Sequence, residues 1–290
     1  MSAERIVTLL PSATEIVCGL GLRDRLVGVT HECDYPTSVI ELPRVTRSAI
    51  DITQSSRDID LAVREHLQAN NALYTIDLPL LRSLQPDLLV TQSLCDVCAV
   101  SGKDVLEALS ELPREPEVIN LEPMTLDEVF ATIDLVGLAA GCLDRAKSYI
   151  SGLKERVKRV REAAEGIPQK PRVGFLEWLD PPFNGGHWTP ELIEYAGGVD
   201  CFGNKHLPST TINHNDIIDA DPDVLIVSLC GFDESRAMEE LESFGLKLDY
   251  EALRAAQSDR VYVLDGNSYF SRPGPRLVEA LEMLFKIIHR

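Results

Sequence analysis

The sequence has little positive charge for its length. Its 290 residues include 28 lysines and arginines against 46 aspartates and glutamates, which gives a formal net charge of -18. A surface that binds nucleic acid or an anionic membrane needs clustered basic side chains, so both partners are disfavoured. The sequence also lacks a run of about 18 consecutive apolar residues, the minimum for a membrane-spanning helix, so we expect no membrane-embedded segment.

Motifs for nucleotide binding and for catalysis are missing too. No Gly-x-Gly-x-x-Gly follows the first predicted strand and no Gly-Lys-Ser/Thr occurs, so a nucleotide site is disfavoured. The sequence shows no partnered Ser-His-Asp pattern and no recognisable catalytic pair of carboxylates. We therefore expect a protein that binds a ligand without catalysis.

The seven cysteines do not suggest a disulfide framework. Their number is odd and they are scattered along the chain, a pattern typical of reduced thiols in a cytosol. Residues 1–17 run into a strand-like segment without the basic stretch, apolar core and small-residue cleavage site of a signal peptide. These observations predict a cytoplasmic protein. The alternative is a periplasmic or extracellular protein whose signal sequence has been removed.

Short runs rich in β-branched residues alternate with helical stretches in both halves of the chain. In parallel sheets covered by helices, strands read as short apolar runs of this kind. Ser12 and Glu15 have the spacing of a capping box at the start of the first helix. The predicted strands span residues 6–10, 26–30, 87–91 and 118–121 in the first half, and 173–178, 223–228 and 261–264 in the second.

The two halves share a matching segment. QPDLLVTQSLC at 85–95 and DPDVLIVSLC at 221–230 both contain Pro-Asp, an apolar strand and a cysteine just past it. The match favours two similar lobes, although Pro-Asp before an apolar run is also a common strand start. Between them, helical periodicity predicts one helix over 143–165, roughly 35 Å long.

These patterns predict an α/β fold of two similar lobes with mostly parallel sheets, joined by one long helix. The predicted segments are an amino-terminal lobe at 1–124, a helical connection at 125–166 and a carboxy-terminal lobe at 167–290.

Aromatic, thiol and polar side chains gather where the predicted strands end. In open parallel sheets the ligand lies outside the carboxyl ends of the strands. Large rings beside glycines suit a broad organic ligand held mainly by apolar contact and a few polar groups. The predicted ligand-binding residues are Ser12, Cys33, Tyr35, Gln92, Cys95, Cys98, Trp178, His187, Trp188, Cys230, Phe232, Tyr269 and Arg272.

Cys95 and Cys98 have the spacing of a metal-binding or redox pair. A structural zinc site would need a second pair at short spacing, which the sequence does not have. We favour thiols that line the ligand cleft. The alternative is a metal, iron-sulfur or redox protein that uses Cys33, Cys95 and Cys98. His187 follows two glycines and is a candidate to ligate a metal within the ligand, or a plain hydrogen-bonding group.

Three stretches carry a resemblance to a known family: RIVTLLPSATEIVCGLGLRDRLVGVTHECDYP at 5–36, LQPDLLVTQ at 84–92 and YFSRPGPRLVEALEMLF at 269–285. With the long central helix, they make the chain similar to the substrate-binding proteins of vitamin B12 and iron-siderophore ABC transporters, and most to the cobalamin-binding branch.

The resemblance implies two α/β lobes joined by one helix, with the ligand in a cleft between them. It implies ligand contacts at 92–98 and 178–188 and cobalamin or a related corrinoid as the bound ligand. It also implies an ABC permease or a cobalamin-using protein as partner. An iron-chelate-binding protein is the alternative.

Overall fold

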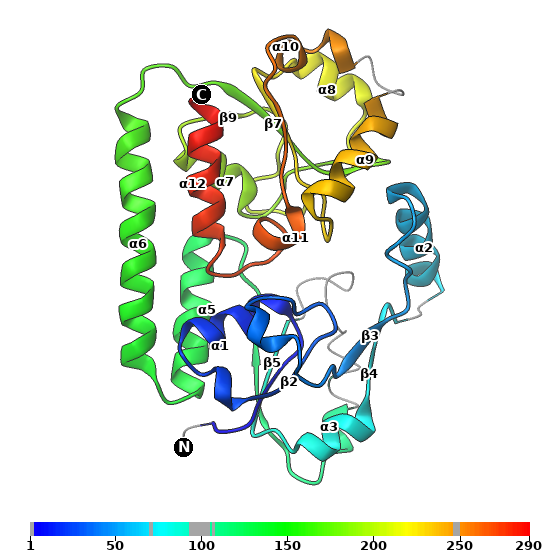
Figure 1. The fold of residues 1–290 in the computed structure, drawn as a ribbon, viewed down its shortest axis with the longest axis vertical. Coiled ribbons are helices and arrows are strands. Elements are labelled where there is room, and N and C mark those ends of the chain that lie inside the picture. Colours follow the sequence, from blue (N-terminus) through cyan, green and yellow to red (C-terminus); the bar gives the residue numbers. More distant parts are fainter. Residues whose placement is uncertain (1–2, 70–71, 93–104, 106–107, 246–249) are drawn as a thin grey trace. The chain divides into compact units, whose positions relative to one another are not determined.

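The computed structural model describes residues 3–69, 72–92, 105, 108–245 and 250–290, and Figure 1 shows their helices and strands. None of the helices in these ranges is long and apolar enough to cross a membrane.

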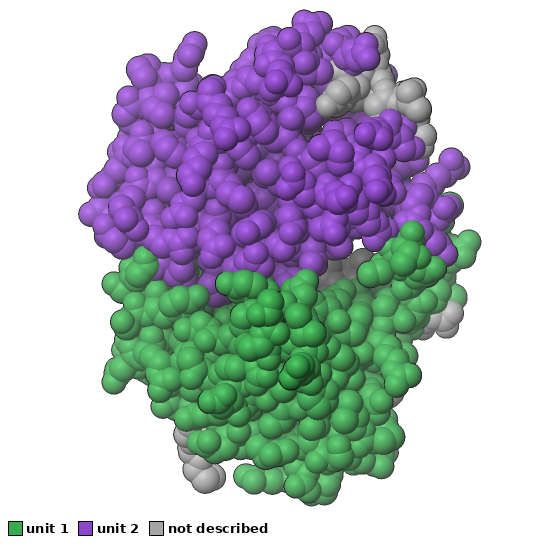
Figure 2. Space-filling view, viewed as in Figure 1, with its two compact units in different colours: residues 1–53, 61–123, 127–152 green, residues 54–60, 124–126, 153–290 purple. Residues whose placement is uncertain are grey.

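The chain forms two compact units, coloured separately in Figure 2. Unit 1 contains residues 1–53, 61–123 and 127–152, and unit 2 contains residues 54–60, 124–126 and 153–290. These bounds differ from the three predicted segments for two reasons. A short stretch of the first half, Gln54–Asp60, belongs to unit 2, and the long central helix contributes residues to both units.

Unit 1 is built on a parallel sheet of four strands (Figure 1). The strands β1 and β5 lie in the middle of the sheet and are buried along their whole length, as expected for strands covered on both faces. A separate antiparallel pair joins β3 (Thr46–Ser48) to β4 (Tyr74–Ile76). The order of the sheet is β2 (Leu26–Val29), β1 (Ile6–Thr8), β5 (Leu88–Thr91) and β6 (Glu117–Asn120).

Helices cover this sheet and pack against it to form a core, in which Val7, Leu81 and Leu89 are fully buried.

The capping box predicted from Ser12 and Glu15 is wrong. Leu10 is the N-cap residue of the first helix and no side chain caps it, because Pro11, which has no N–H to satisfy, takes the first position. The helices of this part of the chain are α1 (Pro11–Gly19), η1 (Arg23–Arg25), η2 (Thr37–Val39), α2 (Ser56–Gln68), α3 (Leu78–Leu84) and α5 (Leu126–Ala139), and the first turn of α2 belongs to unit 2.

Unit 2 is built on a five-stranded sheet in which β7 is the longest strand. One edge of β7 pairs with β10 in parallel, while β8 and β9 also pair with β7, antiparallel and parallel respectively. The strand β10 reads Val-Leu-Ile-Val and is fully buried. The strands are β7 (Arg172–Leu179), β8 (Pro182–Asn184), β9 (Val199–Asp200), β10 (Val224–Val227) and β11 (Val261–Val263).

The helices of unit 2 include an amphipathic closing helix, α12, whose apolar residues Leu277, Leu281 and Leu284 are completely buried. Asn213 and Asp216 form a capping box at the start of α8. The helices are α7 (Thr189–Tyr195), α8 (His214–Ala220), α9 (Glu234–Gly245), η3 (Tyr250–Ala252), α10 (Arg254–Gln257), α11 (Gly266–Tyr269) and α12 (Leu277–Ile288).

The long central helix, α6, spans Leu143–Glu165, as the sequence predicts. Its first residues belong to unit 1, where Arg145 Nη1 donates a hydrogen bond of 2.9 Å to the carbonyl oxygen of Leu20. Its later residues belong to unit 2, where Arg156 binds both carboxylate oxygens of Glu282 at 2.8 Å. Each part of the helix is therefore anchored to its own unit by an arginine.

Candidate functional site

Trp178, near the end of β7, is the partly exposed member of an aromatic stack in unit 2. Its ring meets that of Phe232 edge to face, with centroids 5.1 Å apart. Phe232 is buried, and the guanidinium of Arg236 lies 3.5 Å from the centroid of its ring. The indole nitrogen of Trp178 donates a hydrogen bond of 3.1 Å to the carbonyl oxygen of Ser56. Trp178 thus has partly exposed aromatic surface, and its ring packs against the buried ring of Phe232.

His187 and Trp188 follow β8 and contact each other, with ring centroids 5.3 Å apart. Trp188 is only 6% exposed, and its indole nitrogen donates a hydrogen bond of 3.0 Å to the carbonyl oxygen of Phe270. His187 has a φ of 52°, in the left-handed region, and burial lowers the pKa of its imidazole. His187 is therefore a neutral imidazole at pH 7, which is the form that coordinates metals.

A buried carboxyl group, that of Glu177, fixes the loop that carries His187. Its Oε1 accepts hydrogen bonds from the backbone nitrogen of Gly186 at 2.8 Å and from Thr189 Oγ1 at 3.3 Å. Burial raises the pKa of Glu177, an effect that these hydrogen bonds oppose. Gly186 has no room for a side chain, because a Cβ there would lie 2.3 Å from the backbone nitrogen of Ser209.

The loops that follow β10 and β11 carry the remaining predicted residues of unit 2. Cys230 is exposed. Tyr269, at the end of α11, is partly buried and lies beneath the guanidinium of Arg276, 4.4 Å from its centroid. Arg272 is 6% exposed, and its Nη2 donates a hydrogen bond of 2.8 Å to Asn267 Oδ1. Arg272 is thus a buried cation held in place by a neighbouring amide.

Cys33, in unit 1, takes part in a network of buried hydroxyl groups. Its Sγ lies 2.9 Å from Thr14 Oγ1, which is itself 2.6 Å from Thr8 Oγ1. Cys33 is 2% exposed. The thiol therefore contacts a hydroxyl group of α1, which in turn contacts the hydroxyl group of Thr8 at the carboxyl end of β1.

The other predicted residues of unit 1 differ in exposure. Ser12 and Gln92 are buried, whereas Tyr35 is 44% exposed. Within the part of the chain that the structure describes, the hydroxyl oxygen of Ser12 has no hydrogen-bond partner. Cys95 and Cys98 lie outside the described residues.

His31, which the predicted ligand set omitted, lies two residues after the end of β2 and directly after the strand predicted at 26–30. Its Nδ1 lies 2.8 Å from Thr46 Oγ1, and its ring centroid lies 5.5 Å from that of Tyr74. Burial, with a further contribution from the positive charge of Arg44, lowers the pKa of His31. Its position directly after a strand was the signal that could have identified it.

The described residues contain no group of three or more His, Cys, Asp and Glu side chains that could hold a metal ion. Of the alternative set Cys33, Cys95 and Cys98, the structure describes Cys33 alone.

Most of the sequence matches a protein family. A family model described as periplasmic binding protein matches residues 6–267. The chain belongs to this family. The prediction of ligand binding without catalysis is thereby confirmed, because periplasmic binding proteins bind solutes and are not enzymes.

Among the relatives of this periplasmic binding protein is the vitamin B12-binding protein of Vibrio cholerae serotype O1. The two are 24% identical over 285 residues, which cover 97% of this chain and 88% of the relative. An uncharacterized ABC transporter substrate-binding lipoprotein of Bacillus subtilis (strain 168) is 24% identical over 299 residues, which cover 99% of this chain and 80% of the lipoprotein.

Solved structures share the fold. A protein of Staphylococcus epidermidis described as a possible iron-binding protein has a TM-score of 0.75 and 22% identity, with 100% of each chain covered. The periplasmic vitamin B12-binding protein of Vibrio cholerae has a TM-score of 0.71 and 23% identity over 99% of this chain and 97% of that one. A periplasmic heme-binding protein from Roseiflexus sp. RS-1 has a TM-score of 0.73 and 22% identity over 99% of this chain and 98% of that one. The predicted α/β fold class is confirmed.

The predicted cytoplasmic location is wrong. The family is periplasmic, and the Bacillus subtilis relative is a lipoprotein, so the periplasmic or extracellular alternative fits. The prediction depends on residues 1–17 and on the odd number and scattered positions of the cysteines. A leader that is removed on export leaves no trace in the mature chain, so that stretch of sequence could not decide the location.

Proposed function

We propose that this periplasmic binding protein binds cobalamin or a related corrinoid and delivers it to an ABC permease. The observation that supports this most strongly is the similarity, over 97% of the chain, to a protein described as vitamin B12-binding. The description of a second relative as an ABC transporter substrate-binding lipoprotein supports the permease as partner.

The residues of unit 2 provide suitable chemistry for such a ligand. A corrin is a broad ring with an apolar face and amide side chains around its edge. Trp178 and Tyr269 offer partly exposed aromatic surface for the ring. Arg272, held by Asn267, is the proposed donor to amide oxygens at the ligand's edge.

Heme or another iron chelate is the second candidate. His31 and His187 both have a pKa lowered by burial, so each is a neutral imidazole at pH 7 and able to coordinate iron. A corrinoid would use the same imidazoles differently, as hydrogen-bonding groups or as ligands of cobalt.

Absorption titrations with hydroxocobalamin, cyanocobalamin, hemin and a ferric hydroxamate separate the candidates. We expect a saturable change in the corrinoid bands at equimolar protein, and weak or no binding of the iron compounds. Tight binding of hemin with a shifted Soret band, and no response to either cobalamin, would replace the corrinoid by heme.

The metal or redox alternative is tested by replacing Cys95 and Cys98 together by serine. If both thiols contact the ligand, binding should weaken by roughly 1–3 kcal/mol, while the free energy of unfolding changes by no more than about 0.5 kcal/mol. Cys142→Ser serves as the control, because Cys142 is a half-buried thiol that was not predicted to contact ligand. A stoichiometric metal that is lost from the double variant, with a large fall in Tm, would establish the metal site instead.

A further inference from the structure

A short stretch of the first half of the chain, Gln54–Asp60, is part of unit 2. We call it the strap. In the sequence it is preceded and followed by residues of unit 1, and it contains the first turn of α2. Its contacts with the rest of unit 2 are specific and polar.

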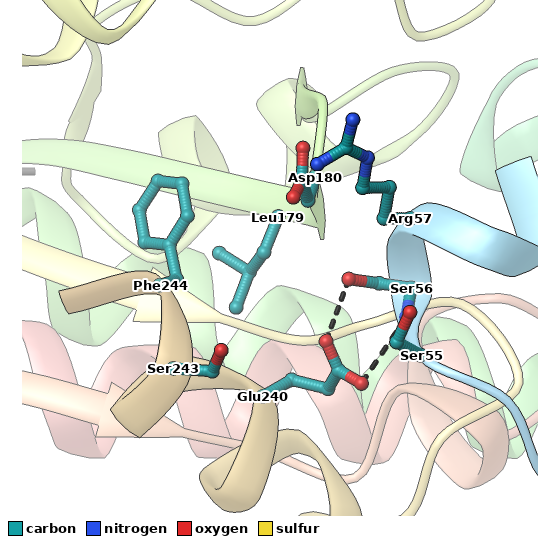
Figure 3. Close-up of a pocket in the computed structure, with 8 residues that line it drawn as sticks. All are labelled: Ser55, Ser56, Arg57, Leu179, Asp180, Glu240, Ser243 and Phe244. Atoms are coloured by element: carbon teal, nitrogen blue, oxygen red, sulfur yellow. Dashed lines mark hydrogen bonds between the residues drawn. The ribbon is translucent and has the colours of Figure 1, made fainter. Parts of the chain in front are cut away.

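Glu240, on α9, holds the start of α2. The backbone nitrogen of Ser56 donates to Glu240 Oε1 at 3.1 Å, and Ser56 Oγ donates to Glu240 Oε2 at 2.6 Å (Figure 3). Ser55 and Asp58 complete the helix start, with Ser55 Oγ donating to Asp58 Oδ2 at 2.7 Å. A carboxylate that accepts from the first N–H groups of a helix is favourable, because the helix dipole is positive there.

The carbonyl groups of the strap bind the aromatic stack. The oxygen of Ser56 accepts the hydrogen bond from the indole nitrogen of Trp178, and the oxygen of Gln54 accepts one of 2.7 Å from Arg236 Nη2. Arg236 also lies over the ring of Phe232, which in turn contacts Trp178. Trp178 and Arg236 therefore bind the strap directly, and Phe232 contacts both of them.

A cavity adjoins one side of the strap. Its volume is about 120 Å³, residues of the strap, of the end of β7 and of α9 line it, and Figure 3 shows them. That volume has room for several water molecules, each of which takes about 30 Å³ in the liquid. The lining includes Ser55, Ser56 and Arg57 on the strap and Leu179, Asp180 and Phe244 opposite. The polar contacts of Ser56 with Glu240 and with Trp178 therefore hold the strap beside this cavity.

We propose that the strap positions Trp178 for the ligand, with Ser56, Arg236 and Glu240 as positioning residues. The effect on ligand binding rests on the proposed function. The hydrogen bonds that hold Trp178 do not depend on it. The indole has a single N–H donor, and its bond to the carbonyl oxygen of Ser56 restricts the rotamer of Trp178. A side chain that is ordered before binding loses less entropy when the ligand arrives.

The geometry is tested without any ligand. The chain contains two tryptophans, so Trp188→Phe leaves Trp178 as the only indole fluorophore. In that background, Glu240→Gln and Arg236→Ala should shift the emission of Trp178 to the red and raise its acrylamide quenching constant about twofold. Both effects are expected because water and acrylamide reach a less ordered indole more easily. Glu242→Gln, at an exposed carboxylate of the same helix, is the matched control and should change neither.

Amide hydrogen exchange provides a second measurement that needs no change at Trp188. Peptides that cover residues 54–60 should exchange several times faster in Glu240→Gln than in the wild type, because the amide of Ser56 loses its charged acceptor. Unchanged exchange together with unchanged quenching would overturn the assignment of Glu240 and Arg236.

Titration with hydroxocobalamin then tests the consequence. Arg236→Ala and Glu240→Gln should raise Kd about 3- to 10-fold with little change in Tm, and Arg236→Lys should recover part of the loss. If the variants free Trp178 and yet bind the corrinoid as tightly as the wild type, positioning for the ligand is refuted. If the wild type binds no corrinoid, the proposed function is refuted instead. The quenching and exchange measurements still test whether Glu240 and Arg236 hold Trp178 and the strap in place.

Discussion

Asp200, at the end of β9, is a carboxylate whose removal should stabilise unit 2 at neutral pH. Burial raises the pKa of Asp200 from 3.8 to about 6, and the negative charge of Glu194 adds to the effect. A hydrogen bond of 2.5 Å from the backbone nitrogen of Gly203 to Asp200 Oδ2 opposes it. Asp200→Asn keeps an oxygen that can accept from Gly203 and removes the charge.

The sign and the size of the effect follow from the two pKa values. Because the folded-state pKa is the higher, the stabilising contribution of Asp200 is fully present below pH 3.8 and is lost as the pH rises through about 6. A shift of about two pKa units corresponds to about 3 kcal/mol. The unfolding free energy of Asp200→Asn minus that of the wild type should therefore increase by about 3 kcal/mol as the pH rises from acid to mildly alkaline.

Urea unfolding followed by tryptophan fluorescence is a suitable assay, because both tryptophans belong to unit 2. The difference between variant and wild type is measured from about pH 4 to about pH 8. Asp223→Asn is the control of opposite sign. A hydrogen bond from the backbone nitrogen of Arg172 lowers the pKa of Asp223, so its contribution is present above pH 3.8 and is lost on acidification. A flat difference curve for Asp200→Asn, or one that falls as the pH rises, would refute the reasoning.

Substitutions at three positions test other parts of the structure. Trp178→Ala should weaken corrinoid binding about tenfold or more and Trp178→Phe less, in calorimetric titrations, because the partly exposed ring supplies apolar contact. Gly186→Ala should lower the free energy of urea unfolding by about 1–3 kcal/mol, because its Cβ would lie 2.3 Å from the backbone nitrogen of Ser209. Arg156→Met should cost about 0.5–1 kcal/mol in the same assay, since the ion pair with Glu282 is partly exposed.

Long periodic and fully apolar segments were predictable from the sequence. The helix α6 occupies the residues predicted for it, and the buried strands β5 and β10 lie within their predicted runs. In such segments a single local pattern decides the structure, because helical spacing sustained over 23 residues or a wholly apolar run leaves few alternatives.

The start of α1 was not predictable from spacing alone. Ser12 and Glu15 have the residue types of a capping box, but Pro11 begins the helix one residue earlier and Leu10 becomes the N-cap. The spacing identifies residues that are compatible with a cap. It does not determine which residue leaves the extended conformation first.

The surroundings of the predicted ligand-binding residues depend on distant partners. The sequence treats Trp178 and Trp188 alike, whereas the structure buries Trp188 and uses its indole nitrogen for a carbonyl group 82 residues away. The pair of Ser56 and Glu240 is separated by 184 residues. No local pattern indicates such pairs, because only tertiary packing brings their elements together.

Calorimetric titration of the purified protein with hydroxocobalamin, with absorption spectra recorded on the same samples, is the measurement on which the proposed function depends. We predict binding of one corrinoid per chain, with a saturable heat and a parallel change in the corrinoid bands. No heat and no spectral change up to high micromolar hydroxocobalamin, from protein whose fold is verified by circular dichroism, would contradict corrinoid binding.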